Sequence, residues 1–127
     1  MKIAALIARI LLGLVFLVFG LNGFLHFLPM TMPTGVAGQF LGALFVSHYL
    51  PFIFFLQILG GVLLLINFFV PLALVLLGPI LVNILFFHAL MDPGGVLPAI
   101  IIALLWIFVV VEHRKYFAGL FVMKAED

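Results

Sequence analysis

The sequence lacks cysteine, and its few charged residues are confined to the two ends of the chain and one loop. Without thiols the chain cannot form disulfides, thiolate metal sites or a redox-active cysteine pair. Between Arg9 and Asp92 there is no Asp, Glu, Lys or Arg. Such a stretch cannot present a water-soluble surface, and the solvent that suits it is hydrocarbon. The composition therefore excludes a soluble domain and predicts an integral membrane protein.

Other absences narrow the function. The formal net charge is only +1, and the clustered cations of a nucleic-acid-binding face are missing. No carboxylate lies within the apolar stretch, which argues against a pump that relies on a buried Asp or Glu. Neither a CxxCH nor an HExxH motif is present. We therefore expect the lipid bilayer as a partner, no nucleic acid, and a chain that is not an enzyme on its own.

What the sequence does contain is a series of apolar segments separated by turn-forming residues. We predict a single all-α domain, residues 1–127, that forms an integral membrane four-helix bundle. The predicted transmembrane helices cover about residues 3–28, 50–69, 71–91 and 96–111, and a cytoplasmic tail covers about 112–127. Each span is near the roughly 20 residues that cross about 30 Å of hydrocarbon.

The stretch between the first two spans is harder to assign. Pro29 and Pro33 end the first span, and apolar residues recur from Val36 to Tyr49. These could form a short interfacial or re-entrant segment, or the first turns of a long second helix. We favour the interfacial or re-entrant segment.

The basic residues predict the orientation. They are Lys2, Arg9, Arg114, Lys115 and Lys124, whereas the loops at 29–49 and 92–95 contain no Lys or Arg. Basic residues mark the cytoplasmic side of a membrane protein. We therefore predict a multi-pass protein of the inner (cytoplasmic) membrane with both termini in the cytoplasm and both longer loops outside.

One face of the first span carries small residues. Six residues, three of them glycine, follow one another at intervals of three or four positions, which places them on one side of a helix: Arg9, Gly13, Phe16, Gly20, Gly23 and Phe27. Glycine allows the backbone of a neighbouring helix to approach closely in a membrane. We expect this face to pack against another helix of the bundle.

Polar residues at membrane depth are the candidate ligand-binding residues. Five of them fall in the predicted outer half: Asn22, His26, Gln57, Asn83 and His88, with His48 and Asp92 at the outer rim. Such residues usually face the bundle interior or a water-filled cavity. They could line a cavity, open to the outside, that binds a small ligand or a quinone head group.

The alternative is that the amides bridge helices, at about 0.6 kcal/mol each, while the histidines lie at the membrane interface. Haem ligation by His26 and His88 is a further alternative.

Three motifs resemble those of a known family. They are Arg9-x-x-Leu12-Gly13-x-x-Phe16-x-x-x-Gly20, Leu56-Gln57-Ile58-Leu59-Gly60-Gly61-x-Leu63-Leu64-Leu65, and Asn83-x-x-Phe86-Phe87-His88 before Asp92-Pro93. Over nearly its whole length the chain resembles the DoxX family of small four-helix bacterial and archaeal membrane proteins. The resemblance implies a membrane partner of oxidoreductases in sulfur or oxidative-stress metabolism. Gln57 stands where many relatives carry an acidic residue, so a proton- or cation-carrying role of that residue is not expected here.

Three functions follow as alternatives. The first is an accessory or anchoring subunit of an oxidoreductase system, with quinone as the one cofactor to consider and with self-association as a further partner interaction. The second is a small-molecule or ion transporter. The third is an assembly factor for other membrane proteins, which would need only the packing faces that this sequence has.

Overall fold

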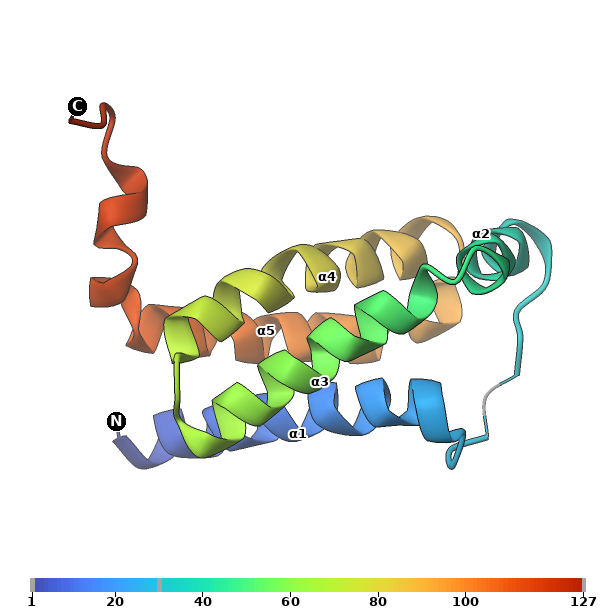
Figure 1. Ribbon diagram of the computed structural model, residues 1–127, viewed down its shortest axis with the longest axis horizontal. Helices are drawn as coiled ribbons and strands as arrows, with labels where there is room; N and C mark the ends of the chain where they lie inside the picture. Colours follow the sequence, from blue (N-terminus) through green and yellow to red (C-terminus); the bar gives the residue numbers. More distant parts are fainter. Residues whose placement is uncertain (1, 30, 127) are drawn as a thin grey trace.

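The structure is a computed structural model that describes residues 2–29 and 31–126. Its elements are α1 (Lys2–Leu25), α2 (Gly35–Val46), α3 (Leu50–Ile66), α4 (Val70–Leu90), η1 (Pro93–Gly95), α5 (Val96–Glu112), η2 (Arg114–Tyr116) and η3 (Ala118–Phe121). The described residues contain no strand. Helices α1, α3, α4 and α5 run up and down along one axis, and both termini lie at the same end (Figure 1).

The length and composition of the helices fit a membrane. Helices α1 and α4, and the continuous stretch from η1 through α5, are each long and apolar enough to cross one. Helix α3 has 17 residues, and α2 and α3 together form a bent pair that also qualifies. The prediction of an all-α integral membrane four-helix bundle is confirmed.

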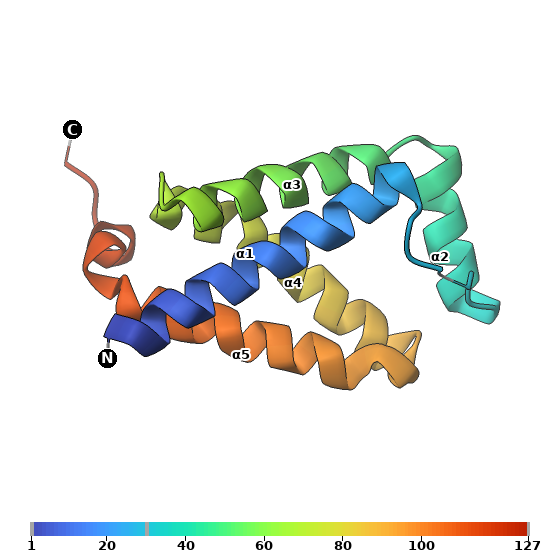
Figure 2. The same cartoon turned by 90° about the horizontal axis from the view of Figure 1, so that it is seen from below.

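Helix α2 is the predicted segment between the first two spans. Its axis lies at 86° to that of α3, so it crosses the end of the bundle opposite the termini (Figures 1 and 2). The bent pair of α2 and α3 has the form of a broken span or a re-entrant segment. We call the end that carries α2 and η1 the loop end, and the end that carries both chain termini the terminal end.

Helix α1 ends at Leu25, three residues before the predicted end of the first span. His26 adopts a left-handed backbone conformation with φ of 53°. Its backbone N–H still bonds the Asn22 carbonyl, at 2.9 Å, but the chain then turns away. Phe27 therefore lies outside the helix, exposed, and does not continue the packing face.

Glycines bring α1 and α3 together. A Cβ added to Gly61 would lie 2.7 Å from the Gly13 carbonyl oxygen and 2.7 Å from the Leu17 nitrogen. A Cβ on Gly20 would lie 3.0 Å from the Phe54 carbonyl oxygen. Backbone thus meets backbone along this contact, as the small-residue face of the first span predicts.

The other helix contacts use larger side chains. Gly60 of α3 accommodates the Leu77 side chain of α4, and Gly78 of α4 faces the Trp106 ring of α5. The Trp106 Nε1–H donates to the Leu74 carbonyl oxygen at 3.0 Å, which ties α5 to α4. The largest fully buried side chains form the core between these helices: Leu12, Leu64, Leu74, Leu77 and Val109.

Candidate functional site

The five candidate residues lie on helices or turns in the half of the bundle nearer the loop end, and none of them lines the two hollows found at the terminal end. Two of them, Asn22 and Gln57, are the buried polar side chains of the described chain. The other three face the surface or a turn.

The Asn22 side chain caps the end of its own helix. Its Oδ1 accepts a hydrogen bond from the Leu28 backbone N–H at 2.7 Å. Helix ends leave backbone groups without helical partners, and a side-chain amide is one way to supply them. Asn22 therefore shapes the turn that follows α1. His26, within that turn, is exposed.

Gln57 points into the bundle. It lies on the same face of α3 as Gly60, Gly61 and Leu64, all of which are buried, and it is 7% exposed. Its Cβ packs beside Gly20 of α1. The Gln57 amide makes no hydrogen bond within residues 2–29 and 31–126, and none of the fully buried side-chain nitrogen and oxygen atoms of these residues lacks a partner. The Gln57 amide therefore keeps some accessible surface, at which a group from outside the protein could bond it.

Asn83 faces away from the interior. It is exposed on the surface of α4, and its Nδ2 donates to the Pro79 carbonyl oxygen one turn earlier, at 2.8 Å. The assignment of Asn83 to the lining of an interior cavity does not agree with this orientation. Asn83 falls one helical turn after the proline, and its amide folds back onto the helix backbone instead of bridging to a neighbour.

His88 lies in the last turn of α4, just before the turn that leads to α5. Its Nδ1 lies 3.2 Å from the Asp92 carbonyl oxygen and 3.7 Å from the Asp92 carboxylate. Gly95 leaves room for the ring, since a Cβ there would clash with His88 Cε1. Phe87 and Phe40 stack at 5.7 Å between ring centroids, which links this turn to α2. The contacts of His88 with Asp92 thus stabilise the turn between α4 and η1 at the loop end.

No pair of histidines forms a metal centre here. His26 is exposed beyond α1, His48 is exposed with a left-handed φ of 63° after α2, and His88 is engaged with Asp92. Within the described residues, no group of three or more His, Asp or Glu side chains could hold a metal ion. The geometry gives no support to the haem alternative that pairs His26 with His88.

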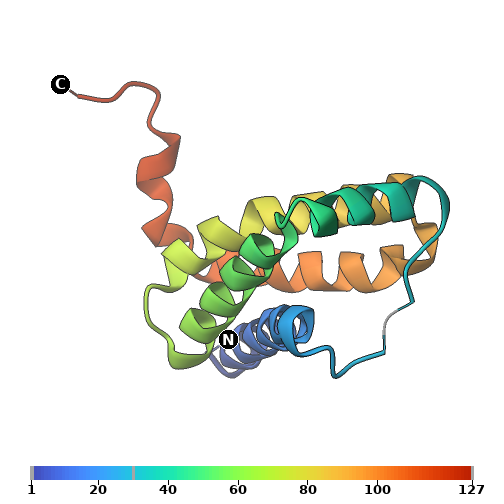
Figure 3. The ribbon, with the colours of Figure 1, turned by 45° about the vertical axis from the view of Figure 1, so that its right-hand side comes forward.

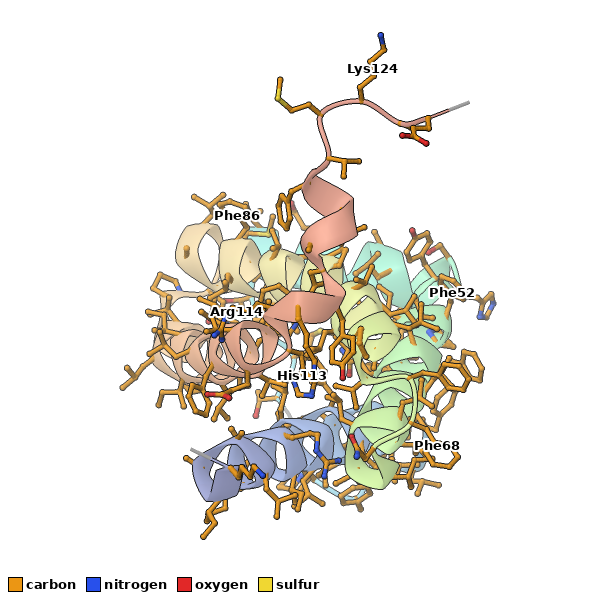
Figure 4. All side chains as sticks on the ribbon, turned by 90° about the vertical axis from the view of Figure 1, so that its left-hand side faces the viewer. Phe52, Phe68, Phe86, His113, Arg114 and Lys124 are labelled. Carbon is orange, nitrogen blue, oxygen red and sulfur yellow. The ribbon has the colours of Figure 1, made fainter. Side chains whose placement is uncertain are left out.

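A second polar region lies at the terminal end, where sequence reasoning placed no site. Two adjoining hollows open there, with volumes of about 380 Å³ and 290 Å³, and both are lined by Asn67 and His113. The larger also contacts the start of α4 and Tyr116, and the smaller contacts Lys2, Arg9 and Glu112. We call this region the terminal hollow. Figure 4 shows His113 at its centre, between α5 and the helices below it.

Backbone contacts hold the polar groups of the terminal hollow in place. Arg9 Nη1 bonds the carbonyl oxygens of Leu64 and, at 3.4 Å, Leu65, in the last turn of α3. A cation there complements the negative end of the helix dipole. His113 Nδ1 donates to the Val109 carbonyl oxygen at 2.8 Å. In a neutral imidazole this leaves Nε2 as an acceptor.

Asn67 completes the hollow through its backbone. It caps α3 in a left-handed conformation with φ of 60°, and its N–H bonds the Leu63 carbonyl. The signal that could have found this region is positional. Arg9, Asn67 and His113 are separated along the chain, but an up-and-down bundle brings the start of one span and the ends of two others to the same side.

No family model matches the chain, and no curated protein or solved structure matches it. The class that the fold defines is an integral membrane four-helix bundle with a crosswise helix at one end and a polar hollow at the other.

Proposed function

We propose that this chain is a non-catalytic accessory or anchoring subunit of a membrane-associated oxidoreductase in the inner membrane. The observation that supports it best is the terminal hollow. A soluble partner can reach a membrane bundle only at its ends. The terminal end offers it charged side chains from Lys2, Arg9 and Glu112 around a recess, whereas the flanks of the bundle are apolar.

The hydrogen bonds of the bundle support a structural role. In the described chain, the side chains of Arg9, Asn22, Asn83, Trp106 and His113 all bond backbone groups. Catalysis by acid, base or nucleophile needs such groups within reach of one another and of a substrate. These side chains instead fix helix ends and helix contacts. The identity of the partner as an oxidoreductase rests on the resemblance to the DoxX family, and cytoplasmic termini rest on the basic residues.

Co-purification in mild detergent tests this proposal. We expect a soluble oxidoreductase to elute with the tagged chain in a fixed ratio. The double variant Lys2→Glu/Glu112→Lys reverses charges on the rim of the terminal hollow without removing the bonds of Arg9 or His113, and should weaken the complex. The control is Gln39→Glu, which changes an exposed residue of α2 at the loop end. Recovery of the chain without any oxidoreductase, or equal recovery from both variants, would contradict the proposal.

A second candidate function is the binding of a small neutral ligand, such as a quinone head group, at Gln57. The Gln57 side chain is 7% exposed and its amide makes no hydrogen bond within the described chain, which favours this candidate. Quinones carry carbonyl oxygens that an amide N–H can bond. Mass spectrometry of extracts from the purified bundle should detect a retained ligand that Gln57→Leu removes. The matched control is Asn83→Leu, because Asn83 faces outward. The same retention in Gln57→Leu as in the unaltered chain would remove this candidate.

A further inference from the structure

The chain after α5 turns out of the bundle axis. Helix α5 ends at Glu112, and η2 and η3 follow at once. Figures 1 and 3 show this stretch running across the terminal end, roughly perpendicular to the helices of the bundle. A segment that continued along the axis would leave the membrane. A transverse segment instead stays at the depth where α5 ends.

The base of this segment is fixed to the bundle. Phe117, between η2 and η3, is buried and belongs to the same apolar cluster as Val70 and Val109. Backbone bonds hold the turns on either side, from Tyr116 N–H to the His113 carbonyl and from Leu120 N–H to the Phe117 carbonyl, both at 3.0 Å. The segment therefore leaves the bundle in a defined direction.

The apolar side chains on either side of Phe117 in this segment are exposed to solvent. Tyr116, Leu120, Phe121, Val122 and Met123 are all exposed, with Phe121 at 80% and Met123 fully so. These residues are consecutive or nearly so, whereas isolated exposed apolar side chains are ordinary on any protein surface. An exposed apolar stretch of this kind marks a surface that binds a protein, a membrane or a ligand.

The charges of the segment indicate its partner. Residues 113–124 contain Arg114, Lys115 and Lys124 and no acidic residue. Arg114 donates one N–H to the Val111 carbonyl oxygen, at 2.9 Å, and is otherwise exposed, and Lys115 Nζ lies 5.1 Å from the Tyr116 ring centroid. Apolar side chains beside cations, at the level where a membrane helix ends, are the pattern of a segment that lies in the headgroup region.

We propose that residues 114–123 form an interfacial anchor that binds anionic phospholipid in the leaflet at the terminal end. Leu120, Phe121 and Val122 enter the boundary between headgroups and acyl chains, about 5–10 Å deep, while Arg114 and Lys115 contact lipid phosphates. Tyr116 lies between, as aromatic residues do at membrane interfaces. The anchor fixes the depth of the bundle at that end. This inference goes beyond the proposed function and does not depend on it.

Site-directed spin labelling tests the anchor in the full chain, which has no native cysteine to remove. A nitroxide at Phe121→Cys should collide more with oxygen, which partitions into lipid, than with a water-soluble nickel complex. Two reference positions bracket the scale. Ile107→Cys, exposed on α5, reports hydrocarbon, and Glu126→Cys reports water. We expect the label at position 121 to fall between them.

Two results of that measurement would overturn the anchor. Nickel accessibility at position 121 equal to that at position 126 places the segment in water. Protection from both collision partners means that protein covers it, either a second copy or a soluble partner.

The lipid preference has its own test. In vesicles containing anionic phosphatidylglycerol, Arg114→Gln/Lys115→Gln should lower the ratio of inserted to exposed label about fivefold per cation removed, since each basic residue near an anionic surface contributes on the order of that factor. Gln39→Glu, which changes a charge on α2 at the opposite end of the bundle, is the control and should leave the ratio unaltered. Equal insertion of the unaltered segment in neutral phosphatidylcholine and in anionic vesicles would overturn the assignment to anionic lipid.

Discussion

The turn between α3 and α4 contains two residues in the left-handed conformation, which most side chains tolerate poorly. Asn67 has φ of 60°, and Phe69, two residues later, has φ of 51°. Asparagine enters this region more readily than most residues, and it commonly ends helices there. Asn67 makes no side-chain hydrogen bond within the described chain, so its backbone conformation is the property that the turn requires.

Substitution at this position separates backbone conformation from side-chain chemistry. We expect Asn67→Ala to lower the free energy of unfolding by about 1 kcal/mol, because alanine pays the steric cost of the left-handed region. Asn67→Gly should be nearly neutral, because glycine does not. Steric-trapping measurements of unfolding in bicelles can compare the two. Equal destabilisation by alanine and glycine would instead indicate that the amide itself contributes.

The sequence predicted the depth of the polar residues better than their direction. Counting along helices was enough to place Gln57 and Asn22 in one half of the bundle. Direction depends on local alternatives that counting does not reveal. Asn83 lies one turn after Pro79 and bonds that carbonyl, and His88 has Asp92 one turn ahead. Both side chains find partners within their own helix or turn, and neither needs a second helix.

At the scale of elements, the closest contact in the bundle joins α1 to α3 although α2 separates them in sequence. Three glycines of α1 face α3, and Gly61 of α3 faces back. The spacing of small residues was visible in the sequence, and so was the packing face. The partner helix was not, because α3 and α4 both carry glycines near mid-span.

Matched glycine variants should show how much this contact matters. Gly61→Ala places a methyl group 2.7 Å from backbone atoms of Gly13 and Leu17, which cannot rotate away. We expect a loss of about 1–3 kcal/mol in the free energy of unfolding, as in other overpacked sites. Gly42→Ala, in helix α2, has nothing within 4 Å of the added carbon and should be neutral or slightly stabilising. Equal stability of the two variants would show that α1 and α3 can separate without cost.

The sequence predicted the helix α2 but not its crosswise direction. Apolar residues between Val36 and Tyr49 indicated a helix, and the prolines before it indicated a break. The angle of 86° to α3 arises at Ser47, His48 and Tyr49, where His48 is left-handed. Pro51 lies in the first turn of α3, but residues 47–49 themselves contain no proline or glycine, so the sequence left a continuous long helix as an alternative.

At the scale of the whole molecule, four antiparallel helices bring the two termini to one end (Figure 1). All basic residues except Arg9 lie in the first two or the last fourteen positions of the chain. This distribution and the fold together favour a single orientation, with the terminal end in the cytoplasm.

Cysteine labelling on intact cells tests the orientation. The single variants Gln39→Cys, on α2, and Lys124→Cys, after η3, place thiols at opposite ends of the bundle. We expect a membrane-impermeant maleimide to label position 39 in intact cells and position 124 only after permeabilisation. The reverse pattern would contradict cytoplasmic termini, and labelling of both positions in intact cells would contradict a single orientation.

The bond between Arg9 and the end of α3 also bears on how the protein is made. Ribosomes deliver α1 to the membrane first, and at that moment its arginine has no carbonyl acceptors from another helix. Those acceptors belong to Leu64 and Leu65, which emerge more than fifty residues later. We therefore expect nascent α1 to be displaced toward the cytoplasmic surface of the bilayer, with the Arg9 guanidinium among the headgroups. Helix α1 should reach its final depth once α3 has been synthesised and supplies these carbonyl acceptors.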